Sequence, residues 1–134
     1  MNRVLTTARR AFDFAPVLLL AYTALLFTVT HLPPTAIPSS VAGSDKHWHF
    51  FAYCGLGLLG SMTALPRTAR WAGLTMLAVA LFACLDELLQ IPVGRSAEWL
   101  DWVADVSGAA VGIGLVLAAS LVPLRERATP SSAA

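Results

Sequence analysis

Four long apolar runs alternate along the chain with short segments that hold most of its prolines and charges. The runs cover Phe14–His31, His47–Leu65, Ala69–Leu89 and Trp99–Leu124. Prolines, which end or kink helices, mark the breaks between them: Pro33, Pro34, Pro38, Pro66, Pro92 and Pro123. A membrane-spanning helix needs about 20 mostly apolar residues. The pattern therefore predicts an all-α fold, an integral membrane bundle of four transmembrane helices.

Basic residues set the expected orientation of this bundle. Seven of the nine lie near the chain ends or between the second and third runs: Arg3, Arg9, Arg10, Arg67, Arg70, Arg125 and Arg127. The other two loops hold only Lys46 and Arg95. Because cytoplasmic loops are enriched in Lys and Arg, we expect both ends inside and the Lys46 and Arg95 loops outside. The expected organisation is a cytoplasmic segment over 1–13, a transmembrane domain over 14–124 and a cytoplasmic tail over 125–134, in the inner or plasma membrane.

Composition supports a bilayer setting. The chain is 57% hydrophobic and only 13% charged, with a mean hydropathy of +0.68. A soluble domain carries about 25% charged residues. The net charge of +1 does not favour nucleic acid as a partner. Cys54 and Cys84 both lie inside apolar runs, so we expect small buried side chains rather than a disulfide framework or a metal motif.

Most acids and histidines gather on the side predicted to face outward. They are Asp45, His47, His49, Asp86, Glu87, Glu98, Asp101 and Asp105. Ionisable side chains are costly inside a membrane and normally face the bundle interior or a water-filled cavity. The pattern therefore predicts one polar pocket that opens at the outer leaflet.

Helical spacing indicates which of these side chains point inward. Asp101 and Asp105 lie four residues apart, and a stripe of small residues, Gly108 and Gly112, continues their face. His49, Tyr53 and Gly57 form a similar stripe in the second run, and Glu87 and Gln90 can share a face of the third. Simpler interpretations remain for others: Asp86 reaching the membrane interface, Glu98 as a solvated charge, Asp45 as a helix cap, and Trp48, Trp99 and Trp102 as an aromatic belt.

Two segments resemble the signatures of the VanZ-like membrane family. DKHWHFFAY, from Asp45 to Tyr53, resembles the pattern D-K-x-x-H-F-x-x-Y, and DELLQIPVGRSAEWLDWVADVSGAAVG resembles the second signature. The matching places in the second segment are Glu87, Gln90, Arg95, Asp101, Asp105, Gly108 and Gly112. Asp105 departs from the Asn that is frequent there, and Ile91 replaces a frequent aromatic residue.

The resemblance implies a small integral membrane protein of a family named after a protein associated with teicoplanin resistance. It also implies a remote relation to membrane enzymes that act on lipid headgroups. On a first hypothesis the chain modifies or binds a lipid or lipid-linked cell-envelope headgroup. Its catalytic residues would be Glu87, His49 and Asp101, and its headgroup-binding residues Lys46, Arg95, Gln90, Tyr53, Asp105 and Asp45. No metal ligands are assigned, although a divalent metal held by converging carboxylates stays an open alternative.

A second hypothesis is a non-catalytic membrane module that binds a lipid, a glycopeptide or a protein partner. In that case Glu87–Arg95 and Asp101–Lys46 are structural ion pairs. A third, a proton or ion path, requires polar residues that continue to the inner side, where the sequence offers few besides Asp13. The sequence alone specifies neither the substrate nor the oligomeric state.

Overall fold

The computed structural model describes residues 14–36, 45–64 and 68–121. These residues form four α-helices: α2 (Ala15–Thr30), α4 (Asp45–Thr63), α5 (Ala69–Gln90) and α6 (Trp99–Leu121). Two short 3₁₀ helices, η1 (Pro34–Ala36) and η2 (Ile91–Val93), follow α2 and α5, and no strand occurs within the described ranges. The all-α prediction is confirmed, and the helices match the apolar runs. The expected ends at Leu65 and Leu124, and the segments 1–13 and 125–134, lie outside the described residues.

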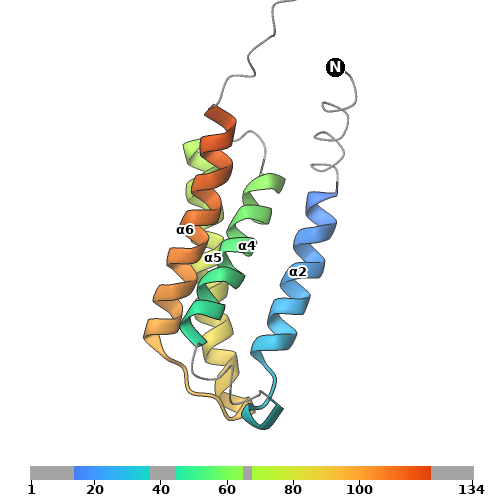
Figure 1. Cartoon of the computed structure of the whole chain (residues 1–134), viewed down its shortest axis with the longest axis vertical. Helices are drawn as coiled ribbons and strands as arrows, with labels where there is room; N and C mark the ends of the chain where they lie inside the picture. The colour runs from blue at the N-terminus through green and yellow to red at the C-terminus, as the bar shows by residue number, and fades with distance from the viewer. Residues whose placement is uncertain (1–13, 37–44, 65–67, 122–134) are drawn as a thin grey trace, which may run out of the picture.

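Consecutive helices run in opposite directions, so the bundle has an up-and-down topology (Figure 1). α4, α5 and α6 form a compact group, and α2 lies along the other side of α4 (Figure 1). The C-terminal ends of α2 and α5 therefore meet the N-terminal ends of α4 and α6. This end of the bundle, the lower one in Figure 1, is referred to below as the polar end.

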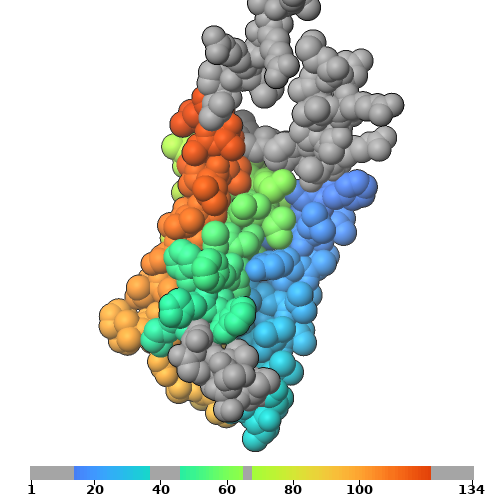
Figure 2. All heavy atoms as spheres, viewed as in Figure 1, coloured from blue at the N-terminus to red at the C-terminus, as the bar shows by residue number. Residues whose placement is uncertain are grey.

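The most extensive helix contact joins α4 to α6, and glycines make it close. A Cβ at Gly57 would lie 2.5 Å from the carbonyl oxygen of Ala109. A Cβ at Gly108 or Gly112 would overlap the carbonyl oxygens of Phe50 and Cys54, respectively. The predicted Gly108–Gly112 stripe of α6 is therefore confirmed as facing α4. Of the predicted α4 stripe, His49 and Gly57 face α6, whereas the Tyr53 hydroxyl donates to Asp86 of α5. Atoms of α4 fill the space between α2 and α6 (Figure 2).

The bundle is apolar on its surface and partly polar in its interior. Large hydrophobic side chains are exposed on all four helices, among them Leu20, Phe51, Leu81 and Leu115. Two helical segments, Ala69–Val93 and Trp99–Leu121, are long and apolar enough to cross a membrane, and Ala15–Thr30 is apolar but shorter. An apolar surface of this kind is typical of helices that face lipid.

The expected burial of both cysteines is wrong. Cys54 is half-buried and Cys84 is exposed, and both are free thiols. The buried face of α5 carries Val79, Ala83 and Asp86. One residue turns a helix by about 100°, so Cys84 lies beside this face rather than on it.

Candidate functional site

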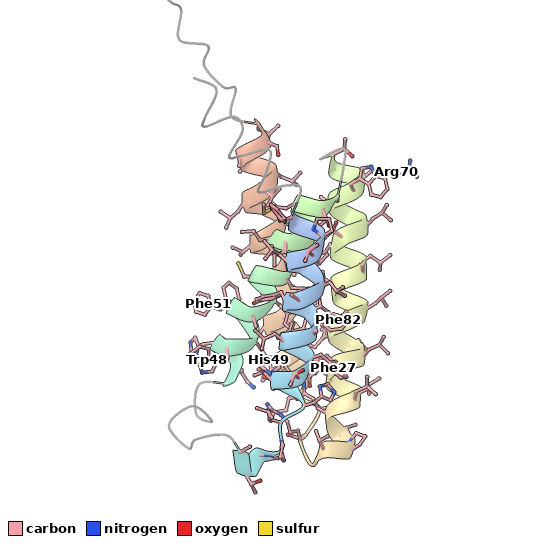
Figure 3. The ribbon with its side chains drawn as sticks, turned by 90° about the vertical axis from the view of Figure 1, so that its right-hand side faces the viewer. Phe27, Trp48, His49, Phe51, Arg70 and Phe82 are labelled. Carbon is pink, nitrogen blue, oxygen red and sulfur yellow. The ribbon has the colours of Figure 1, made fainter. Side chains whose placement is uncertain are left out.

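Buried polar side chains gather at the polar end. They are Thr30, His49, Asp86, Glu87, Gln90, Asp101 and Asp105. His49 lies toward the bundle interior, whereas its neighbours Trp48 and Phe51 point away from it (Figure 3). The hydrogen bonds divide the buried groups into two clusters, one around His49 and one around Asp86.

The first cluster, called the histidine cluster, consists of His49, Glu87, Asp101 and Asp105. His49 Nδ1 lies 2.9 Å from Asp105 Oδ1, a hydrogen bond in which the protonated Nδ1 donates. The same nitrogen lies 3.9 Å from Glu87 Oε1. One ligand-capable atom each from His49, Glu87 and Asp101 lies within 4.8 Å of the other two. Side chains from α4, α5 and α6 therefore converge on one small volume.

Lys46 and Glu98 form the solvent-facing rim of this cluster. Lys46 Nζ donates to Asp101 Oδ1 at 2.7 Å and to Glu98 Oε2 at 3.0 Å. The backbone amide of Glu98 donates to Glu87 Oε2 at 3.0 Å. The hydrogen bond from Lys46 holds the pKa of the Glu98 carboxyl below its ordinary value. The rim ties the loop before α6 to both α4 and α5.

The helix dipoles make the position of Glu87 costly and that of Asp101 favourable. Asp101 lies in the first turn of α6, where the positive end of the dipole stabilises a carboxylate. Glu87 and Asp86 lie in the last turn of α5, where the negative end disfavours one. Hydrogen bonds offset this unfavourable placement: the Glu98 amide donates to Glu87, and neutral side chains donate to Asp86.

The second cluster, called the aspartate cluster, surrounds Asp86. Its carboxylate accepts hydrogen bonds from Thr30 Oγ1 at 3.0 Å, Tyr53 OH at 3.2 Å and Gln90 Nε2 at 3.4 Å. His31 Nδ1 lies 3.6 Å from Asp86 Oδ1. Neutral donors from α2, α4 and α5 thus satisfy the hydrogen-bonding capacity of the Asp86 carboxylate. Through these hydrogen bonds Asp86 connects α5 to α2 and α4.

The structure places the sequence-predicted residues in different environments. The three predicted catalytic residues, His49, Glu87 and Asp101, lie together. Gln90 and Tyr53 belong to the aspartate cluster instead, and both are buried, Tyr53 at 0% and Gln90 at 2% exposed.

Other predicted residues lie at or near the rim. Lys46 is exposed, and Arg95 is half-buried, with its backbone amide donating to the Gln90 carbonyl oxygen at 3.2 Å. The predicted Asp101–Lys46 ion pair is confirmed. The side chain of Asp45 lies outside what the structure describes.

The interpretation of Asp86 as an interfacial charge is wrong, because it is only 1% exposed and fully hydrogen-bonded. Sequence reasoning also missed its partners Thr30 and His31. Little in the sequence indicates this contact, because Thr30 and His31 are simply the last two residues of an apolar run and have no charged neighbour in sequence.

Comparison with known proteins identifies one match. The family described as VanZ/LLP1 matches residues 21–121, a range that contains both clusters and the rim. No curated protein and no solved structure matches the chain.

Proposed function

The chain belongs to the VanZ/LLP1 family, and on that basis we propose that it is a four-span membrane protein whose polar end binds and modifies a lipid headgroup. The headgroup belongs to a membrane lipid or a lipid-linked cell-envelope precursor. The observation that carries the proposal is the histidine cluster. One ligand-capable atom each from His49, Glu87 and Asp101 lies within 4.8 Å of the other two, and all three side chains are buried.

The membrane part of the proposal rests on the surface and on the basic residues. Exposed leucines, valines and aromatic side chains cover the helices and suit contact with lipid tails. Seven of the nine Lys and Arg residues lie in sequence near the chain ends or close to the connection between α4 and α5, whereas Lys46 lies at the start of α4 and Arg95 lies between α5 and α6, at the polar end. The polar end therefore faces outward, at the level of the outer-leaflet headgroups.

The chemistry proposed for the cluster is proton transfer to or from a bound headgroup. Asp105 accepts from Nδ1 of His49, which makes Nε2 the nitrogen with the lone pair. Glu87 is held through one oxygen by the Glu98 amide, so its other oxygen is oriented toward His49. His49 and Glu87 are thus positioned as a general acid–base pair. Lys46 and Arg95 at the rim are the cations for an anionic headgroup.

A second candidate function, a non-catalytic binding module, is favoured by the Lys46 contacts. Lys46 joins α4 to the loop and first turn of α6 through Glu98 and Asp101. On this hypothesis the ion pairs of Lys46 hold the helix ends together, and the polar end binds a ligand without catalysing a reaction. Removing one partner of a structural ion pair lowers the amount of folded protein, whereas removing one member of an acid–base pair lowers activity while the fold remains.

Glu87→Gln separates the two functions, because it keeps the shape of the side chain and removes its proton chemistry. Cells would produce the parent protein, Glu87→Gln, or Ser107→Ala as a matched control on the exposed face of α6. Membrane levels and melting temperatures in detergent would be matched first. Mass spectrometry of total lipids and lipid-linked precursors would then compare the three strains.

A headgroup species that appears or vanishes with the parent and Ser107→Ala, but not with Glu87→Gln, supports the enzyme and identifies its substrate class. Identical lipid profiles in all three strains contradict catalysis. In that case lipid extracted from the purified parent and from Lys46→Gln decides between binding and no binding. A lipid enriched only with the parent supports the module, and equal lipid content contradicts it.

A further inference from the structure

The polar end encloses four carboxyl groups. Asp86, Glu87, Asp101 and Asp105 are each at most 6% exposed. Lys46 contacts Asp101 and is shared with the exposed Glu98. A buried carboxylate needs a proton, a hydrogen-bond network or a cation. Asp86 has its network of neutral donors, whereas the histidine cluster places three acids around one imidazole.

The geometry of the histidine cluster suits a metal ion. His49, Glu87 and Asp101 come from three different helices, and their ligand-capable atoms lie within 4.8 Å of one another. Ligand atoms bound to one cation at about 2.0–2.2 Å lie about 3–4 Å apart. Because Asp105 accepts from His49 Nδ1, Nε2 is the nitrogen with a lone pair for the cation.

Each of the three side chains is also held by a further partner. Asp105 accepts from His49, the Glu98 amide donates to Glu87, and Lys46 donates to Asp101. Ligands of metal ions are oriented in this way, because the second partner fixes the ring or carboxylate in the ligating position. A carboxylate has two oxygens, so Glu87 and Asp101 can each keep this partner and ligate a cation.

Two carboxylate oxygens of the cluster are buried without a hydrogen bond to the residues that the structure describes. Glu87 Oε1 is fully enclosed and has no hydrogen bond within the described part of the chain, and the same holds for Asp105 Oδ2. Buried polar atoms are almost always satisfied, so an enclosed carboxylate oxygen that faces an imidazole requires an explanation. A cation between Glu87, His49 and Asp101 supplies it.

We infer that His49, Glu87 and Asp101 bind one divalent cation of the Mn²⁺ or Zn²⁺ class. Imidazole favours transition metals over Ca²⁺ or Mg²⁺, and carboxylates complete the set without thiolates. Three protein ligands leave coordination positions open. If the proposed function holds, a headgroup phosphate takes one of them, and His49 and Glu87 then act as ligands of the cation that holds this phosphate rather than as a free acid–base pair. The cation site itself does not depend on the lipid reaction.

The test measures metal binding without any lipid substrate. The full chain, purified in detergent and stripped with a chelator, would be titrated with Mn²⁺ by electron paramagnetic resonance and with Zn²⁺ by calorimetry. We expect one saturable site for the parent. We expect affinity to fall more than about 100-fold in Glu87→Gln and in Asp101→Asn, since losing an outer-shell partner alone costs about 10–100-fold.

Asp86→Asn is the matched control, because Asp86 is also a buried acid of α5 but belongs to the aspartate cluster. It should bind the cation as the parent does. If one ligand variant does not fold, the other still serves, and the rise in melting temperature of the parent with added metal gives a second readout. No saturable site in the parent, or equal weakening by Asp86→Asn and Glu87→Gln, overturns the inference. Neither result bears on the lipid comparison, so the two proposals fail separately.

Discussion

The α4–α6 contact is built in two different ways along its length. Near the polar end, His49 and Lys46 of α4 meet Asp105 and Asp101 of α6 through hydrogen bonds and an ion pair. Beyond it, Gly57 and the α6 glycines let the two backbones touch. In lipid, where burial of apolar surface between helices brings little gain, close packing of this kind holds helices together. The glycine half therefore fixes the geometry, and the polar half is free to carry charge.

Substitutions in the glycine half should abolish folding, because a backbone carbonyl cannot move aside. Conservative substitutions in the polar half should leave the fold intact and change the proposed binding of cations and headgroups. Four variants, from the largest expected effect to the smallest, test this division.

Gly108→Leu should have the largest effect. A Cβ at Gly108 already overlaps the backbone of Phe50, so a leucine must force α6 away from α4. Overpacking a core typically costs about 1–3 kcal/mol, and a clash with backbone lies at or above the upper end. We expect little folded protein in detergent extracts, measured by size-exclusion chromatography and thermal melting.

Gly114→Leu is the control for this variant, because a Cβ at Gly114 meets nothing within 4 Å although it lies on the same helix. It should melt as the parent does. Equal losses for the two variants would show that helix propensity or membrane insertion, and not the α4–α6 contact, governs stability.

Asp86→Ala should have the next largest effect. It leaves the donors of Tyr53 and Gln90 without this acceptor in a buried site, whereas the Thr30 hydroxyl can still donate to the Phe27 carbonyl oxygen at 3.2 Å. An unsatisfied buried group costs about 1–3 kcal/mol, and water entering the vacated space offsets part of the sum, so we expect a loss of about 3 kcal/mol. Asp86→Asn retains an acceptor oxygen and should lose clearly less. A thermal or denaturant series in detergent gives the difference, and equal losses would contradict a role for the hydrogen bonds.

Tyr22→Phe should have a smaller effect. The Tyr22 hydroxyl donates to the Ala52 carbonyl oxygen at 2.8 Å and fastens α2 to α4. Removing one such hydrogen bond costs about 1 kcal/mol. Thr28→Val is the control, since Thr28 donates only to Ala24 of its own helix and is exposed. A melting temperature lowered in Tyr22→Phe but not in Thr28→Val would confirm that α2 is attached through this contact.

The glycine contact between α4 and α6 and the polar end of the bundle also differ in how far the sequence predicts them. Helix bounds follow from the length of each apolar run and the prolines after it, and the glycine stripes follow from the spacing of four residues. The environments of Asp86 and Glu87 could not be predicted from the sequence. These neighbours diverge by about 100° around α5, so each enters a different cluster. The partner of Asp86 in α2, Thr30, lies 56 residues away, and only the packing of the helices reveals that contact.

Glu98→Gln should have the smallest effect on stability, and one that depends on pH. Both Lys46 and Glu98 are about half exposed, so water and salt screen their ion pair. The pKa of Glu98 is lowered from its ordinary value of 4.5 by the hydrogen bond from Lys46. The ion pair therefore stabilises the fold fully above about pH 4.5, and this contribution is lost as the pH falls through the lower, folded-state value.

Melting curves of the parent and Glu98→Gln should thus differ slightly at neutral pH and converge in acid, and the neutral-pH difference should shrink at high salt. The Glu98 backbone amide still donates to Glu87 in the variant, so cation affinity should stay close to that of the parent. A large drop in cation affinity would instead mean that the Glu98 carboxylate itself joins the histidine cluster when metal binds. The loop before α6 would then be part of the cation site.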